Sequence, residues 1–433
     1  MKTTALVLAA LTASIAIGGC NCTGNSGSNA GATGGVGSGA AATAAAPEPT
    51  LTQKASKLQN GLAVDLSAGD CGDQIALAVH LGVGIDNDPE GRSGMVNLIG
   101  RILATTAPAG KAARTVETGS DFTVYTITAA AEPLIAELDD AAAWMTKPTA
   151  TEADFDREKK RLLDDIGQLA GNNAAATAKS LAEEAVVPTR GNGKRLGVAK
   201  EVEAITFAEL TAFWQAHVAA GNARIAVAGA FDVEKVRAKI ETAFGGLPAG
   251  SPPNRRTAGE ATVKGTLVMG ETPKAVAIAV PAPEPKDPLF APFLVLAARL
   301  VEKPATPRTW EAHYDPLKRP EVLLITGPVG DAEQAEPAAA RMRAEAGSAL
   351  SAPVTADDVT RAYTVFGLFL EPELNKVAMC KNDARAFAVG RARRTLAAPP
   401  PPAITVTADQ QREAAALFDA KHSAAVIAGG AIR

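Results

Sequence analysis

Apolar residues with two different periods divide the first half of the chain into strands and helices. Continuous or alternating apolar runs predict strands at residues 62–66, 75–84, 122–128 and 223–229. Apolar residues at helical spacing predict helices at about residues 93–105, 133–145, 206–218 and 232–244, and a long polar helix that opens at Thr151. Strands and helices do not alternate regularly, which favours an α+β fold over a doubly wound sheet.

The second half of the chain repeats the pattern of the first. Three segments recur in the same order about 200 residues later: 75–79 at 276–280, Thr206 at Thr407, and 223–229 at 423–429. Any one match between alanine-rich segments could arise by chance, but three at nearly one offset predict a duplicated domain. We therefore expect a first domain at residues 51–250, a Pro-, Gly- and Arg-rich linker at 251–264, and a second domain at 265–433.

The N-terminus has the pattern of a secretion signal. Lys2 precedes an apolar run at residues 5–17, which is too short to span a bilayer as a mature helix. The segment 17–20, Ile-Gly-Gly-Cys, resembles the lipobox of bacterial lipoproteins. We expect a signal peptide at residues 1–19, a lipid on Cys20, and a flexible tether over residues 20–50.

This pattern predicts a lipoprotein anchored to a membrane of the bacterial envelope and facing the periplasm. Asn21 is not the aspartate that retains some lipoproteins in the inner membrane, which favours the outer membrane.

Composition and charge narrow the function classes. The chain is 47% hydrophobic and 21% charged, with 4% aromatic residues, so its cores are expected to use many small side chains. A net charge of −4 gives no electrostatic footprint for nucleic acid. Of the four cysteines, Cys71 and Cys380 lie outside the lipobox region. Secretion permits a disulfide between them, although two separated cysteines are more often unpaired.

Several segments together resemble one family. Residues 205–250 contain a threonine-capped helix, a strand ending in glycine, and an acid-led helix closing at Phe-Gly and Leu-Pro. This stretch resembles the insulinase/pitrilysin family of zinc peptidases, which includes the mitochondrial processing peptidase. Residues 58–66 and 119–125 are similar to two further strands of the family. The resemblance implies two homologous α+β domains, each a mainly antiparallel sheet packed with helices.

The resemblance places the family's chemistry on the helix that follows residues 86–91. Active members carry His-x-x-Glu-His there, with two histidines as zinc ligands and a glutamate that activates water. The corresponding residues here are Gly94, Asn97 and Leu98, in that order. None of these three residues can bind the metal or act as the base, so we expect no zinc cofactor and no catalytic residues.

The third zinc ligand of the family lies on the long polar helix. Its position falls on Asp165, and an auxiliary acid of the family falls on Glu158. The two acids are seven residues apart and share a helix face. A helix with alternating charges is also typical of a solvated surface, so these acids alone do not indicate a site.

Other chemical templates find no support in the sequence. The four histidines are separated and none belongs to a Cys/His cluster, which excludes a structural zinc site of the usual spacing. No Walker loop and no G-x-S-x-G between a strand and a helix occur. The histidines are His80, His217, His313 and His422.

Three functions remain open. The first is a non-catalytic subunit that pairs with an active homologue carrying His-x-x-Glu-His and helps to enclose peptides or unfolded segments. The second is a stand-alone envelope lipoprotein that binds peptides or proteins. The third is a zinc peptidase with a non-standard site. We favour the first, because the family forms such pairs and the whole motif is lost while the scaffold is kept.

Overall fold

The computed structural model describes most of the chain beyond the predicted tether. The described residues are 50–106, 112–146, 150–172, 174–186, 196–251, 266–269, 272–302, 308–317, 322–330, 333–370, 376–394 and 404–429. The fold below is that of the compact unit Pro49–Arg433. The predicted signal peptide, Cys20 and nearly all of the tether lie outside the described residues. Within the described ranges, no helix is long and apolar enough to cross a membrane.

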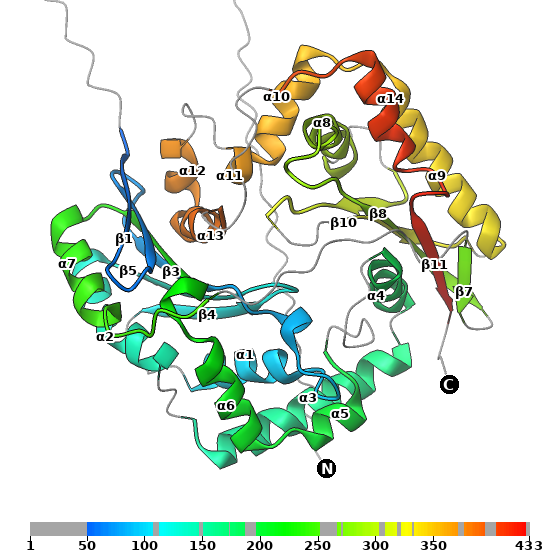
Figure 1. Ribbon diagram of the computed structural model, residues 1–433. Coiled ribbons are helices and arrows are strands. Elements are labelled where there is room, and N and C mark those ends of the chain that lie inside the picture. The colour runs from blue at the N-terminus through cyan, green and yellow to red at the C-terminus, as the bar shows by residue number, and fades with distance from the viewer. Residues whose placement is uncertain are drawn as a thin grey trace, which may run out of the picture. The chain divides into compact units, whose positions relative to one another are not determined.

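The first sheet is formed by strands of the first half of the chain. They are β1 (Thr52–Lys57), β2 (Ala63–Ala68), β3 (Ile75–Leu81), β4 (Ala113–Thr118), β5 (Thr123–Ala129) and β6 (Ala223–Gly229). Their order in the sheet is β1-β2-β6-β3-β5-β4. Figure 1 labels four of these strands, β1, β3, β4 and β5. The β2–β6 pair is parallel and the other neighbouring pairs are antiparallel.

The second sheet repeats this arrangement. Its strands are β7 (Thr266–Met269), β8 (Pro273–Pro281), β9 (Glu311–His313), β10 (Val322–Pro328) and β11 (Ala424–Gly429). They lie in the order β7-β11-β8-β10-β9, with β7–β11 parallel and the other pairs antiparallel. This is the order β2-β6-β3-β5-β4 of the first sheet, with the same strand directions. The predicted α+β class is confirmed, and the strands behind the predicted duplication occupy equivalent places.

Helices of the first half pack mainly beside the first sheet. They are α1 (Met95–Thr105), α2 (Ala131–Thr146), α3 (Glu152–Asn172), α4 (Ala174–Val186), α5 (Ala199–Ala204), α6 (Phe207–His217) and α7 (Val233–Phe244), with short 3-10 turns at Ile85–Asn87 and Ala220–Asn222. Buried residues of α1, α2 and α7 form one core with the larger strand residues.

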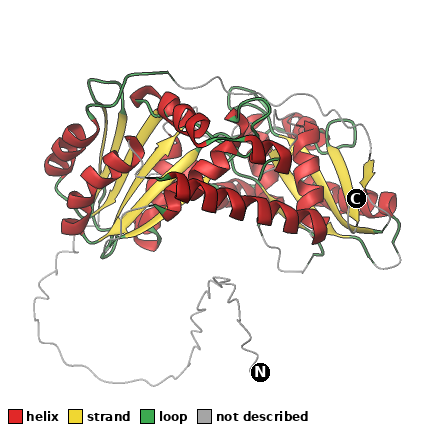
Figure 2. Cartoon of the chain, turned by 90° about the horizontal axis from the view of Figure 1, so that it is seen from below, coloured by secondary structure: helices red, strands yellow, loops and turns green. Residues whose placement is uncertain are grey.

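Most helices of the second half pack beside the second sheet. The helices of this half are α8 (Phe290–Val301), α9 (Ala335–Ser351), α10 (Ala356–Val365), α11 (Gly367–Leu370), α12 (Lys376–Asn382), α13 (Ala384–Arg394) and α14 (Ala408–Ala416). Buried residues of α8, α9, α10 and α14 form a core with the second sheet, and α12 and α13 instead lie against the first sheet. Figure 2 shows helices on either side of the strands.

Strand residues alternate between large and small side chains. On β3, Ile75, Leu77 and Val79 face the core shared with α1, α2 and α7, whereas Ala76 and Ala78 face the other way. The same alternation occurs on β8. Small residues let a helix approach the sheet closely, which explains how a chain so poor in aromatics buries both faces of its strands.

The alanine faces are covered by helices exchanged between the two halves. Helix α13 from the second half packs on the alanines of β3 and β6 in the first sheet, through Phe387 and Ala388 among others. Helix α4 from the first half packs on the alanines of β8 and β11 in the second sheet, through Ala178 and Ala182. The predicted domain boundaries remain a prediction, and this packing crosses them in both directions.

A disulfide joins the exchanged segment to the first sheet. Cys71, just after β2, is bonded to Cys380 of α12, 309 residues further along the chain. Both residues are buried, and Lys381 pairs with Asp70 beside them at 2.6 Å. The expectation that two separated cysteines stay unpaired is therefore wrong. Their pairing depends on the docking of α12 and α13, which sequence spacing does not reveal.

The two threonines matched by the repeat have the same local role. Thr206 accepts a hydrogen bond from the Glu209 amide at the start of α6, and the Glu209 carboxylate accepts one from the Thr206 amide. Thr407 and Gln410 form the same capping box at the start of α14. Such boxes satisfy the free amides of a first helical turn, and they confirm the predicted helix starts.

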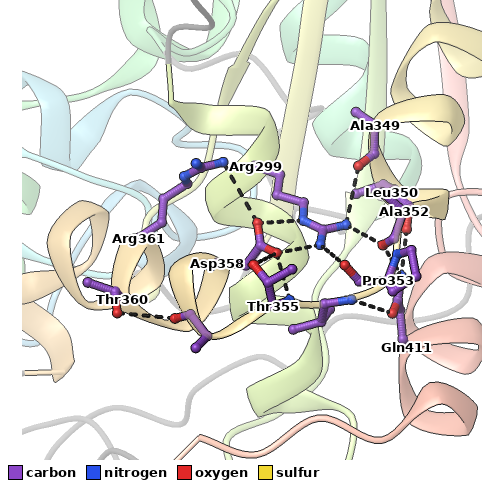
Figure 3. Close-up of polar contacts among 12 residues, drawn as sticks. Arg299, Ala349, Leu350, Ala352, Pro353, Thr355, Asp358, Thr360, Arg361 and Gln411 are labelled. Atoms are coloured by element: carbon purple, nitrogen blue, oxygen red, sulfur yellow. Dashed lines mark hydrogen bonds and ion pairs between the residues drawn. The ribbon is translucent and has the colours of Figure 1, made fainter.

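A polar network joins α8 to α10 in the second half (Figure 3). Arg299 of α8 donates to both oxygens of Asp358 at 3.0 and 2.7 Å, and to the carbonyl oxygens of Ala352 and Pro353. Asp358 also accepts a hydrogen bond from the Thr355 amide, which caps α10. The Arg299 and Asp358 side chains are only 7% and 10% exposed, so this hydrogen-bonded ion pair is buried.

Candidate functional site

The candidate site lies where α1 begins, because the family resemblance places the zinc motif there. The loop before α1 places the carboxylate of Asp88 against the helix start, where it accepts hydrogen bonds from the Gly94 amide at 2.6 Å and the Val96 amide at 2.8 Å. Burial raises the pKa of the Asp88 carboxyl to about 7, and these two hydrogen bonds oppose the rise. Asp88 thus fixes where the helix starts.

Gly94, at the position of the family's first histidine, precedes the first residue of α1. The helix was predicted from about residue 93, but it begins at Met95, and Gly94 is its N-cap with a left-handed φ of 91°. A Cβ at this position would lie 2.8 Å from the Leu196 carbonyl oxygen and 2.8 Å from a Val202 methyl group. The backbone here requires glycine, since side chains disfavour both the conformation and the contact.

Leu98, at the position of the second histidine, is part of the core. Its side chain is fully buried among the other apolar residues of α1 and the first sheet. No polar group could replace it without losing this packing.

Asn97 and Asp165 are brought together, and a cation lies between them. Arg101, one turn after Asn97 on α1, donates from Nε to Asn97 Oδ1 at 2.9 Å. Its Nη2 donates to Asp165 Oδ2 at 2.7 Å, which joins α1 to α3. The Arg101 and Asp165 side chains are 26% and 44% exposed. The guanidinium therefore bridges the positions of the family's water-activating base and third ligand.

Glu158, the auxiliary acid position, is not on a solvated face. Its side chain is 3% exposed, and its Oε1 accepts hydrogen bonds from Arg157 at 3.0 Å and Arg161 at 2.8 Å. The surface alternative for α3 is therefore wrong at this residue. Glu158 is engaged by two arginines of its own helix.

These residues do not fit a zinc ion of the family's type. Gly94 offers no ligand, Leu98 is apolar and buried, and the one remaining carboxylate, Asp165, is already bound by a guanidinium. Among the described residues, no group of three or more His, Cys, Asp or Glu side chains is arranged to hold a metal ion.

Arg101 is the site residue that sequence reasoning missed. Gly94, Asn97 and Arg101 are spaced three and four residues apart and so lie along one side of the helix start. A cation four residues after Asn97 was a visible signal. Its partner Asp165, however, lies 64 residues further on, and only the packing of α1 on α3 brings the two together.

Comparison with known proteins finds one matching family model and solved structures of similar fold. Residues 204–365 match the family model described as the peptidase M16 inactive domain. The fold is similar to that of a protease from Helicobacter pylori, with 16% identity and a TM-score of 0.68 over 87% of this chain and 99% of that one. It is also similar to the peptidase M16 inactive domain from Pseudomonas fluorescens, with 17% identity and a TM-score of 0.66 over 88% and 98%.

A third solved structure is longer than this chain. The match to the periplasmic protease PqqL from Escherichia coli has 15% identity and a TM-score of 0.64, and covers 87% of this chain but 47% of PqqL. No curated protein sequence matches the chain significantly. The predicted resemblance is confirmed: the chain has the fold of the M16 peptidases, the insulinase-like class, and matches one of their domain models.

Proposed function

We propose that this chain is a non-catalytic, insulinase-like lipoprotein that pairs with an active homologue and helps to enclose peptides. The observation that carries the proposal is the Arg101 guanidinium bound to Asp165 at 2.7 Å, on a helix that also lacks both histidines and the glutamate. Replacing one ligand could tune a metal site. Replacing three residues and engaging the fourth position with a cation removes the means of activating water.

Pairing is supported by the proportions of the fold. A match over 87% of this chain takes up only 47% of PqqL. The unmatched part of that longer protease leaves room for a second unit of similar size. A separate homologue with an intact His-x-x-Glu-His would supply such a unit here.

Anchoring at the envelope is supported by two independent features. The sequence at residues 17–20 resembles a lipobox, and a buried disulfide joins Cys71 to Cys380. Disulfides persist in oxidising compartments such as the bacterial periplasm. We propose that the Cys20 lipid holds the chain at the periplasmic side of a membrane, with the outer membrane favoured by Asn21.

The test is to purify the tagged chain from its native cells in mild detergent and identify what accompanies it. The proposal expects an M16 homologue with an intact His-x-x-Glu-His in near-equal amount. Recovery of the chain alone or only with itself would favour a stand-alone binding protein instead. A Cys20→Ala variant is the control for anchoring, and it is expected to leave the membrane fraction.

A further inference from the structure

The α1–α3 junction keeps a positive charge at the place where the family binds its metal. Arg101 reaches two different groups with two nitrogens: Nε binds Asn97 Oδ1 at 2.9 Å, and Nη2 binds Asp165 Oδ2 at 2.7 Å. In the family alignment these partners stand at the base and third-ligand positions. A zinc ion at this place would likewise join the two helices through side chains of both.

We propose that Arg101 is a built-in cation that takes over the structural part of the metal's role, holding α1 to α3 and compensating Asp165. This inference rests on the proposed loss of catalysis in one respect: a chain that used zinc here could not also hold a guanidinium on Asp165. Arginine suits the task, since its planar group is always charged and can bind two acceptors at once.

An ordinary surface ion pair is the competing explanation. Asp165 is 44% exposed, and pairs of that kind usually contribute little. The two explanations differ in what can replace the arginine. If the junction needs a cation at this place, a metal ion held by new ligands on α1 should restore what loss of the guanidinium removes.

The chain offers such a replacement without touching Gly94 or Leu98. Residues 97 and 101 are four apart on α1, so Asn97→His and Arg101→His would place two imidazoles on one face, pointing to Asp165 as a third ligand. Histidine is shorter than the arginine that it replaces. A zinc ion between imidazole and carboxylate adds two bonds of about 2 Å, which makes up the missing length between residue 101 and Asp165.

The experiment is a metal rescue of the N97H/R101H variant of the full chain. Without metal, its melting temperature is expected to fall below that of the wild type. With zinc at about 100 times the dissociation constant it should rise by about 5 °C, with one zinc bound per chain and reversal by chelator. The matched control N97H/R101H/D165N should bind zinc at least about tenfold more weakly and lose the rescue.

The proposal is overturned if N97H/R101H melts like the wild type, if zinc does not raise its melting temperature, or if D165N leaves the rescue intact. These outcomes do not depend on any partner or on peptide cleavage. If the wild-type chain bound zinc and cleaved peptides, that result would instead contradict the proposed function. The two failures are therefore distinguishable.

Discussion

Each half of the molecule carries an arginine–aspartate pair between equivalent helices, and the two pairs are used differently. Helices α1 and α8 follow the equivalent strands β3 and β8, and α3 and α10 each follow the helix after the equivalent strands β5 and β10. In the second half, Arg299 and Asp358 are buried and bound to carbonyls and a helix cap. In the first half, Arg101 and Asp165 are half-exposed, and Arg101 also holds Asn97.

The two pairs also differ in the groups that they bind. Besides Asp358, Arg299 binds backbone carbonyl oxygens at the end of α9 and in the segment before α10, those of Ala349, Ala352 and Pro353 (Figure 3). In the first half, the Arg101 guanidinium binds two side chains, Asn97 and Asp165, which the family resemblance assigns to the metal site. The second-half pair is therefore a buried structural contact, whereas the first-half pair lies where the resemblance places the family's metal ligands.

Loss of the disulfide should have the largest effect on the free energy of unfolding. It sharpens the comparison because it alters neither of the two arginine–aspartate pairs. The C71S/C380S variant is expected to lose about 3–5 kcal/mol in the free energy of unfolding, because the bond closes a very long loop. Hydrogen exchange should rise first in α12 and α13 and stay unchanged at α8 and α10. Unchanged protection of α13 would show that the bond is not what holds the exchanged segment.

Asp358→Asn tests the buried pair. Removing one partner leaves the Arg299 charge buried without its counter-ion, so the expected loss is about 3 kcal/mol in the free energy of unfolding. Denaturant titration measures it. A loss as small as that expected for Arg101→Met would remove the distinction between the two regions.

The same residue predicts a pH dependence. Hydrogen bonds from Arg299 hold the pKa of the Asp358 carboxyl well below its usual value. A depressed pKa gives stability that is present above the unfolded-state pKa of about 3.9 and is lost as the pH falls below it. The wild type should therefore lose its advantage over Asp358→Asn as the pH falls from about 5 towards 2. If the wild type kept a constant stability advantage over Asp358→Asn across this pH range, the lowered pKa of Asp358 would be contradicted.

Gly94→Ala tests whether the backbone itself excludes the family's first ligand. The left-handed φ and the two close contacts predict a loss of about 2 kcal/mol. Gly167→Ala on α3 is the matched control, since no atom lies within 4 Å of its added Cβ. That variant should gain up to about 1 kcal/mol from helix propensity. Equal effects at the two glycines would mean that residue 94 could accept a side chain.

Arg101→Met should have the smallest effect, about 0.5–1 kcal/mol, because the pair is half-exposed. The control Arg412→Met removes an exposed pair within one helix and should change nothing measurable. Thermal melts of the two variants side by side give the difference. A loss at Arg101 as large as that at Asp358 would mean that it is an ordinary core pair.

The sequence predicted the parts of the fold that depend on local pattern. The strands β3 and β6, their repeats β8 and β11, and the capped helices after Thr206 and Thr407 carry their signals within a few residues. The edge strands β1 and β4 were not predicted, because their partly exposed residues have no strong apolar alternation. The exchanged helices α4 and α13 were also missed, since their apolar partners are alanines on a distant sheet.

For the site, residue types were predictable and geometry was not. The absence of His-x-x-Glu-His from residues 94–98 can be read from the sequence. The left-handed backbone at Gly94 and the burial of Glu158 depend on packing against segments far along the chain. The bond from Arg101 to Asp165 has the same origin.

The most direct test of the central claim is the zinc content of the purified full-length chain, measured together with its cleavage of unstructured peptides. The account predicts far less than one zinc per chain and no cleavage that a chelator abolishes. One zinc per chain, with chelator-sensitive cleavage by this chain alone, would contradict it.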